Sequence, residues 1–143
     1  MLVLGASFTF FENGLGGPML DIIINGTDAQ TRLAEMNAKQ RGLHVLITAT
    51  LDSLYPLANF GFLAGLAARF AKGWRRWAVL PACLYVVADF AENIVQILAL
   101  KGADHLLTLK DILTPLKFLG FVAAAILVLI LLIIAAIRKL SNR

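Results

Sequence analysis

Four polar side chains lie at helical spacing inside an apolar stretch of the sequence, residues 84–98. An ionisable group in hydrocarbon costs about 2.5 kcal/mol or more on insertion scales, and two of the four are carboxylic acids. We therefore expect them to face other polar groups, where the acids could bind a cation or move a proton. Their positions i, i+3, i+4 and i+7 share one helix face: Asp89, Glu92, Asn93 and Gln96.

A second polar stripe precedes the first, with spacings of four, three and four residues: Thr48, Asp52, Tyr55 and Asn59. Pro56 interrupts this stripe. Because proline has no backbone N–H, it cannot donate to the carbonyl of Asp52 one turn earlier, and the helix should bend there. The sequence thus predicts a free carbonyl acceptor beside the carboxylate of Asp52.

The composition places these stripes in a membrane protein. Of 143 residues, 59% are hydrophobic, the mean hydropathy is +0.80, and one cysteine excludes a disulfide framework. We expect an all-α fold, an integral membrane four-helix bundle in a single domain over residues 1–143. The predicted spans are 1–24, 43–69, 78–100 and 111–137, with an amphipathic extramembrane helix at 27–42.

The first predicted span is short, because an apolar run of 11 residues ends before the Gly16-Gly17-Pro18 break. We interpret it as a short or truncated span; a broken span and a re-entrant segment remain open. No basic region marks it as a signal peptide.

Basic residues give the topology. Four of them surround the 70–77 loop, and three more follow the last span: Arg69, Lys72, Arg75 and Arg76, then Arg138, Lys139 and Arg143. The positive-inside rule places both clusters in the cytoplasm of a bacterial cell, with the chain in the inner (plasma) membrane. Segment 25–42 and loop 101–110 then lie outside. The net charge of +4 marks helix ends, so no nucleic-acid partner is expected.

Counting about 1.5 Å per residue along each span places the polar residues at one level in the outer half of the bilayer. Antiparallel packing would then bring them together in one pocket. Three acids against one lysine leave excess negative charge, so we expect one carboxyl to hold a proton. Candidate proton-handling acids are Asp52, Glu92 and Asp89, and candidate ligand-binding residues are Tyr55, Asn59, Asn93, Gln96 and Lys117.

The other interpretation is structural, because polar side chains also lock membrane helices together, at about 0.6 kcal/mol each. No spacing of His, Cys, Asp and Glu typical of a metal site is present, and no cofactor is expected.

Two strings carry a resemblance: L-D-S-L-Y-P at residues 51–56 and D-F-A-E-N at residues 89–93. With the preceding T-D-A-Q-T-R-L-A-E-M helix, residues 19–100 resemble an uncharacterised family of small four-span bacterial membrane proteins bearing D-x-x-Y-P and D-x-x-E-N. More distantly, the layout is similar to the EXPERA fold of sterol isomerases and the sigma-2 receptor, although no diagnostic string of that fold is present. That likeness implies a lipid-facing cavity in which Asp52 and Glu92 handle protons.

These observations lead to three functional hypotheses. The first is an acid-rich pocket that binds a sterol, isoprenoid or lipid, with double-bond isomerisation as the reaction such acids could catalyse. The second is a structural accessory subunit of a larger membrane complex, whose polar stripe meets a partner membrane protein. The third is a small proton-coupled exporter. Whether the chain is an enzyme stays open.

Overall fold

A computed structural model describes residues 15–141, and every regular element in that range is helical. The predicted all-α fold is therefore confirmed at this level. Most of the predicted first span lies outside the described residues. In chain order the elements are η1 (Leu20–Ile22), α2 (Gly26–Glu35), α3 (Ala38–Ala49), α4 (Leu51–Phe70), η2 (Lys72–Trp74), α5 (Arg75–Ala78), α6 (Leu80–Leu100), η3 (Asp104–Leu109) and α7 (Lys110–Ser141).

The predicted helix 27–42 is in fact two helices, α2 and the first turn of α3. Asn37 begins α3 with a reciprocal capping box: its side chain accepts from the Gln40 amide, and the Gln40 side chain accepts from the Asn37 amide. The Arg41 side chain meanwhile donates to the last carbonyls of α2, those of Leu33 and Met36. These caps end one helix and start the next, which the apolar pattern alone did not reveal.

The predicted span 43–69 is also divided. Thr50 leaves the helical region with φ −113° and ψ −82°, so α3 ends and α4 begins there. The Thr50 hydroxyl donates to the carbonyl of Leu46 at 2.6 Å, and the Ser53 hydroxyl donates to that of Thr48 at 2.9 Å. Such side-chain bonds compete with the backbone ladder and bend helices.

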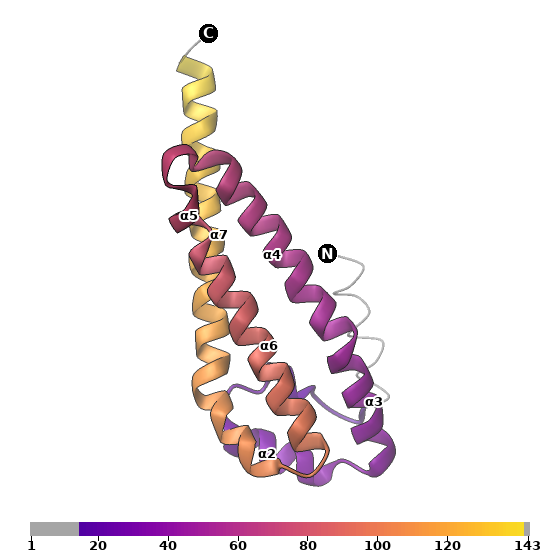
Figure 1. Cartoon of the computed structure of the whole chain (residues 1–143). Coiled ribbons are helices and arrows are strands. Elements are labelled where there is room, and N and C mark those ends of the chain that lie inside the picture. Colours follow the sequence, from indigo (N-terminus) through magenta and orange to yellow (C-terminus); the bar gives the residue numbers. More distant parts are fainter. Residues whose placement is uncertain (1–14, 142–143) are drawn as a thin grey trace.

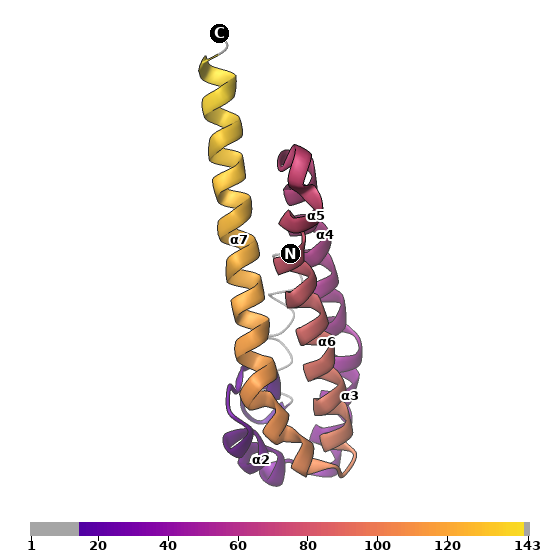
Figure 2. The ribbon, with the colours of Figure 1, turned by 60° about the vertical axis from the view of Figure 1, so that its left-hand side comes forward.

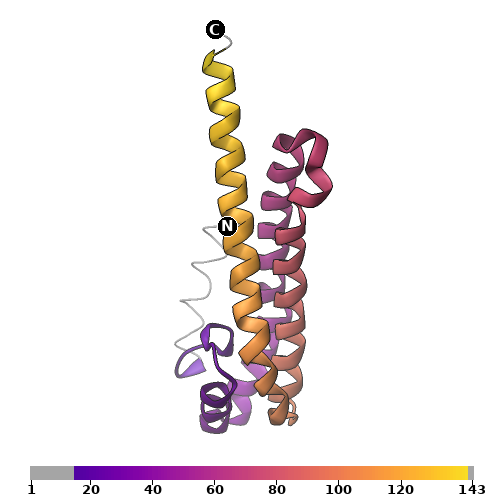
Figure 3. The ribbon, with the colours of Figure 1, turned by 90° about the vertical axis from the view of Figure 1, so that its left-hand side faces the viewer.

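Three long rods lie side by side: α3 followed by α4, then α6, then α7 (Figures 1 and 3). Gly120 allows α6 and α7 to approach closely, since a Cβ there would lie 2.7 Å from the backbone N of Tyr85. The spacing of Gly61 and Gly65 also predicts close helix contact. A Cβ on either would meet no atom of residues 15–141 within 4 Å, so the described residues do not show the predicted contact.

The two ends of the bundle differ. At one end α2 and η3 pack under the rods, and at the other the chain turns through η2 and α5 while α7 continues beyond its neighbours (Figure 2). The core has an apolar cluster near each end. Between them lies a layer of buried polar side chains, here called the polar layer, which includes Asp52, Asp89, Glu92 and Lys117. Members of the first cluster include Leu33, Met36, Val95 and Leu107; members of the second include Leu63, Ala82, Ala124 and Val128.

Two helical stretches of the described residues are long and apolar enough to cross a membrane, Lys72–Leu100 and Asp104–Ser141. The predicted spans 78–100 and 111–137 fall within them. The divided segment 43–69 is not among them. Many large apolar side chains on α6 and α7 are exposed, among them Val87 at 66%, Ile112 at 67% and Leu119 at 63%.

Candidate functional site

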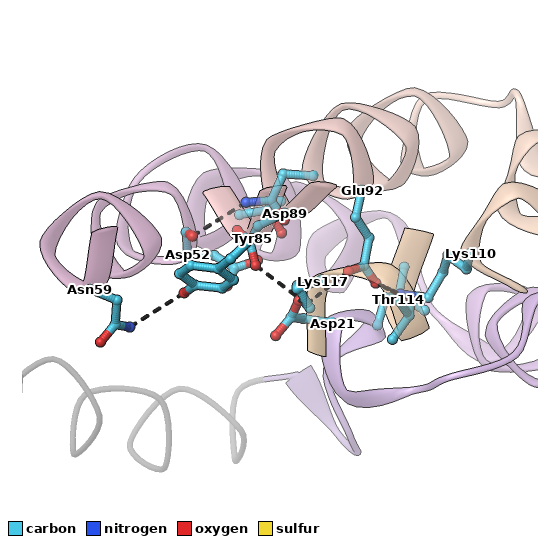
Figure 4. A network of polar contacts seen from close by, with 12 residues as sticks. Asp21, Asp52, Asn59, Tyr85, Asp89, Glu92, Lys110, Thr114 and Lys117 are labelled. Atoms are coloured by element: carbon cyan, nitrogen blue, oxygen red, sulfur yellow. Dashed lines mark hydrogen bonds and ion pairs between the residues drawn. The ribbon is translucent and has the colours of Figure 1, made fainter. Parts of the chain in front are cut away.

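Glu92 is the centre of the buried polar layer. It projects from α6 toward α7, where the Thr114 hydroxyl donates to its Oε1 at 2.7 Å and the ammonium of Lys110 pairs with the same oxygen. The ammonium of Lys117 lies 2.7 Å from Oε2. Lys110, Thr114 and Lys117 are spaced by four and three residues, so one face of α7 surrounds this carboxylate (Figure 4).

Lys117 joins three carboxylates from different elements. Besides Glu92, its Nζ pairs with Asp21 Oδ1 from η1 and lies 3.5 Å from Asp89 Oδ1 on α6. The Lys117 side chain is 5% exposed and that of Asp21 is 23% exposed. Charges buried to this extent persist only when they are paired, because desolvation is expensive.

Asp21 reaches this layer because the chain before α2 is fixed in place. The Leu20 amide donates to Nε2 of His44 at 3.0 Å, and Nδ1 of His44 lies 3.1 Å from the Thr48 hydroxyl. Since Nε2 accepts, the proton of this fully buried imidazole is on Nδ1, and the ring is neutral. At the start of α2, the backbone amide of Gly26 donates to Asp111 Oδ1 at 2.7 Å. His44 is thus a structural residue that holds η1 against α3.

Asp52 meets α6 through its backbone. The carbonyl that Pro56 leaves free accepts a hydrogen bond from Nδ2 of Asn93 at 3.3 Å. This contact joins the D-x-x-Y-P and D-x-x-E-N strings directly.

A cavity of about 180 Å³ opens beside these groups. Asp52 and Asp89 are 4% and 5% exposed, and Oδ2 of each has no hydrogen-bond partner among residues 15–141. A buried carboxylate oxygen without a donor is unfavourable by about 1–3 kcal/mol or more. The described residues that line the cavity are Asp21, Asp52, Tyr55, Tyr85, Asp89, Lys117, Phe118 and Phe121.

Tyr85 adds a hydroxyl to the cavity wall. Its Oη accepts from Nδ2 of Asn59 at 3.3 Å, which leaves its own hydrogen to donate to another group. Its ring packs edge-on against Phe121 with centroids 5.3 Å apart. Gly120, the neighbour of Phe121, allows this close approach of α7 to Tyr85. The wall is therefore acidic on one side and aromatic on the other.

The structure divides the sequence-predicted site residues into three groups. The lining residues are Asp52, Asp89, Tyr55 and Lys117. Residues that contact the lining through an ion pair or a hydrogen bond are Glu92, Asn59 and Asn93. Gln96 belongs to neither group: it is fully buried, and neither atom of its amide has a hydrogen-bond partner among the described residues.

Sequence reasoning missed Asp21, Lys110 and Tyr85. Lys110 could have been found, because it lies two helical turns before Lys117 on the same face of α7. It also supplies a second cation to balance the excess of acids. Asp21 precedes α2 in a short 3-10 turn, where no periodicity predicts its direction.

The cluster contains four carboxyl groups and two ammonium groups: Asp21, Asp52, Asp89 and Glu92 against Lys110 and Lys117. Fully ionised, it would carry two uncompensated negative charges. Such a site favours protons or a bound cationic donor. No group of three or more His, Cys, Asp or Glu among residues 15–141 has the arrangement of a metal site.

Comparison of the chain with protein-family models, curated proteins and solved structures finds no match.

Proposed function

We propose that this chain is a multi-pass membrane protein whose buried cavity binds the hydroxyl- or ammonium-bearing head of a hydrophobic molecule. The observation that carries the proposal is a pair of buried carboxylate oxygens beside a cavity, Asp52 Oδ2 and Asp89 Oδ2, to which no described residue donates. A proton, or a hydrogen-bond donor such as a hydroxyl or an ammonium group, would satisfy them.

Membrane placement is supported by the surface of the bundle. The exposed residues along α6 and α7 are predominantly large and apolar, whereas Asp89, Glu92 and Lys117 of the same helices are buried. This arrangement suits lipid outside and polar partners inside. The basic residues of η2 and of the α7 end lie at the same end of the rods, so we propose that this end is cytoplasmic and that α2 and η3 lie outside.

The size of the cavity limits what it can enclose. About 180 Å³ is below the roughly 300–1,000 Å³ of pockets that bury a drug-sized ligand. We therefore propose that the cavity holds a head group, while the apolar body of a sterol, isoprenoid or lipid lies along the outer face near Phe118, which is 46% exposed.

The chemistry follows from how the acids are partnered. Glu92 is held by two lysines and a threonine, so we propose that it positions Lys117 instead of exchanging protons. Asp52 and Asp89, with the hydroxyl of Tyr85 nearby, are the groups that could give and take a proton. Double-bond isomerisation is the reaction that such a pair could catalyse, with one acid donating a proton and the other accepting one.

Thermal stability in detergent with four probes tests the proposal: dodecylamine, dodecanol, dodecyl methyl ether and dodecyl sulfate. We expect the amine to raise the midpoint most, the alcohol less, and the ether and sulfate not at all. Asp52→Asn and Asp89→Asn should each weaken amine binding about tenfold, the effect of losing one charge-assisted hydrogen bond. Asp104→Asn, which alters an exposed acid at the outer end, is the matched control.

Equal stabilisation of the wild type and both cavity variants would remove the proposal. In that case the polar layer would serve helix packing alone, as expected of an accessory subunit. The exporter hypothesis would instead be favoured if the affinity for the amine, measured in vesicles, changed when a proton gradient was imposed.

A further inference from the structure

A second polar surface lies at the opposite end of the bundle, far from the acidic cavity. A groove of about 580 Å³ runs between the corner that joins α4 to η2 and the C-terminal part of α7. Its lining contains three cationic residues from two segments distant in sequence, Arg69 and Lys72 on one side and Arg138 on the other. None of its described lining residues is acidic.

The three cations have no counter-charge within the described chain. The ion pairs within residues 15–141 join Arg32, Lys110 and Lys117 to acids, and none includes a residue of the groove. The guanidinium carbon of Arg69 lies 5.8 Å from the centroid of the Phe70 ring. Like charges brought together by folding are unfavourable unless an anion joins them.

Apolar residues also line the groove. They include Leu131, Ile134 and Ala135 of α7, together with Trp74, which is 47% exposed. Tryptophan at this position is typical of the level of lipid headgroups. The groove thus offers cations for a phosphate and an apolar wall for an acyl chain, a combination that a free phosphate ion would not use.

The backbone holds one of the cations at some expense. Lys72 has φ +40°, a conformation that glycine adopts far more readily, although Gly73 is the next residue. A non-glycine residue held there costs about 1–3 kcal/mol, and such positions cluster at ligand clamps. This backbone turn keeps Lys72 in the groove, between the end of α4 and Trp74.

We propose that this groove binds the headgroup of an anionic phospholipid of the surrounding leaflet. Arg69, Lys72 and Arg138 contact the phosphate, and one acyl chain lies along Leu131 and Ile134. The inference uses the membrane placement proposed above but not the acidic cavity. The bound lipid would join the end of α4 to the C-terminal part of α7, beside the buried apolar cluster that already packs these helices together.

Lipid selectivity tests this inference. The protein is reconstituted in nanodiscs of mixed phosphatidylglycerol and phosphatidylcholine, extracted in mild detergent, and its retained lipid is identified by mass spectrometry. We expect the wild type to retain phosphatidylglycerol at least fivefold over its share of the mixture. The triple variant Arg69→Gln/Lys72→Gln/Arg138→Gln should lose this enrichment, since each cation contributes about fivefold near an anionic headgroup.

The matched control removes the same charge elsewhere: Lys39→Gln/Lys101→Gln/Lys139→Gln. Lys139 is adjacent to Arg138 on α7 but does not line the groove. The control should keep the enrichment. If the triple groove variant does not fold, Arg138→Gln and Lys72→Gln are measured singly, and each should reduce enrichment severalfold.

Two results would overturn the inference. Equal enrichment in the wild type, control and groove variants would mean that the cations set topology only. Displacement of phosphatidylglycerol by soluble glycerol phosphate at equal concentration would mean a simple anion site, without acyl-chain contact. Failure of the protein to enter nanodiscs at all would contradict the membrane placement itself, which separates that outcome from the other two.

Discussion

Asn93 Nδ2 donates to the backbone carbonyl oxygen of Asp52 at 3.3 Å, across the interface of α6 and α4. The acceptor is available because Pro56 has no N–H to offer it. A sequence feature of one helix is thus completed by a side chain of another, and the two together fix the cavity wall that Asp52 provides.

This relationship predicts thermodynamic coupling between Asn93 and Pro56. Asn93→Ala should lower the free energy of unfolding by about 1 kcal/mol, because it leaves a buried carbonyl unsatisfied. In a Pro56→Ala background the new amide can bond that carbonyl, so the same change should cost less, with a coupling of about 0.5–1.5 kcal/mol. Chemical denaturation in detergent of the four proteins of the cycle measures it. Strictly additive costs would show that the two residues act independently.

The two buried lysines should differ in importance. Lys117→Met removes the partner of three carboxylates and should destabilise the protein by about 3–5 kcal/mol. Lys110→Met should cost less, because Glu92 keeps Lys117 and Thr114. The exposed Lys101→Met is the control and should stay within about 0.5 kcal/mol. The order would be disproved by equal losses for the two buried lysines.

Gly120 should tolerate no side chain. A Cβ there would lie 2.7 Å from the Tyr85 backbone N and 3.1 Å from the Pro81 carbonyl, and neither atom can move without shifting α6. Gly120→Ala should therefore destabilise by about 1–3 kcal/mol. At Gly65 no described residue lies within 4 Å of an added Cβ, so Gly65→Ala should change stability by no more than about 0.5 kcal/mol. Comparable losses at both positions would contradict the close α6–α7 packing.

Topology can be measured by cysteine labelling in intact cells. With Cys83 replaced by serine, we expect Lys39→Cys to react with a membrane-impermeant maleimide from outside. Lys72→Cys should react only after the membrane is permeabilised, because the η2 end is proposed to be cytoplasmic. The opposite pattern would invert the proposed orientation, and labelling of neither without permeabilisation would remove the outer placement of α2.

Residue spacing predicted much of the polar layer. The stripes of α4 and α6 were recognisable because each follows the helical repeat within an apolar segment, and the effect of Pro56 follows from local chemistry. The sequence did not reveal which groups on neighbouring helices bind to Asn93 and Lys110, because tertiary packing determines those partners. The break at Thr50 and the capping box at Asn37 depend on hydrogen bonds that do not alter the apolar pattern.

Asp21 shows the other limit. Its position depends on His44 and Gly26, which fix the irregular chain before α2 from both sides. Irregular segments have no period, so their side-chain directions are set by the contacts of the folded molecule. An acid in such a segment can join a buried cluster without any signal in the sequence.

The most direct test of the acidic cavity is an experimental structure of the protein in nanodiscs with dodecylamine. The account predicts density for the ammonium group within hydrogen-bonding distance of Asp52 Oδ2 and Asp89 Oδ2, with the alkyl chain leaving past Phe118. Carboxyl groups of Asp52 and Asp89 that turn away from a shared space, or amine density bound elsewhere with these oxygens satisfied by the protein itself, would contradict it.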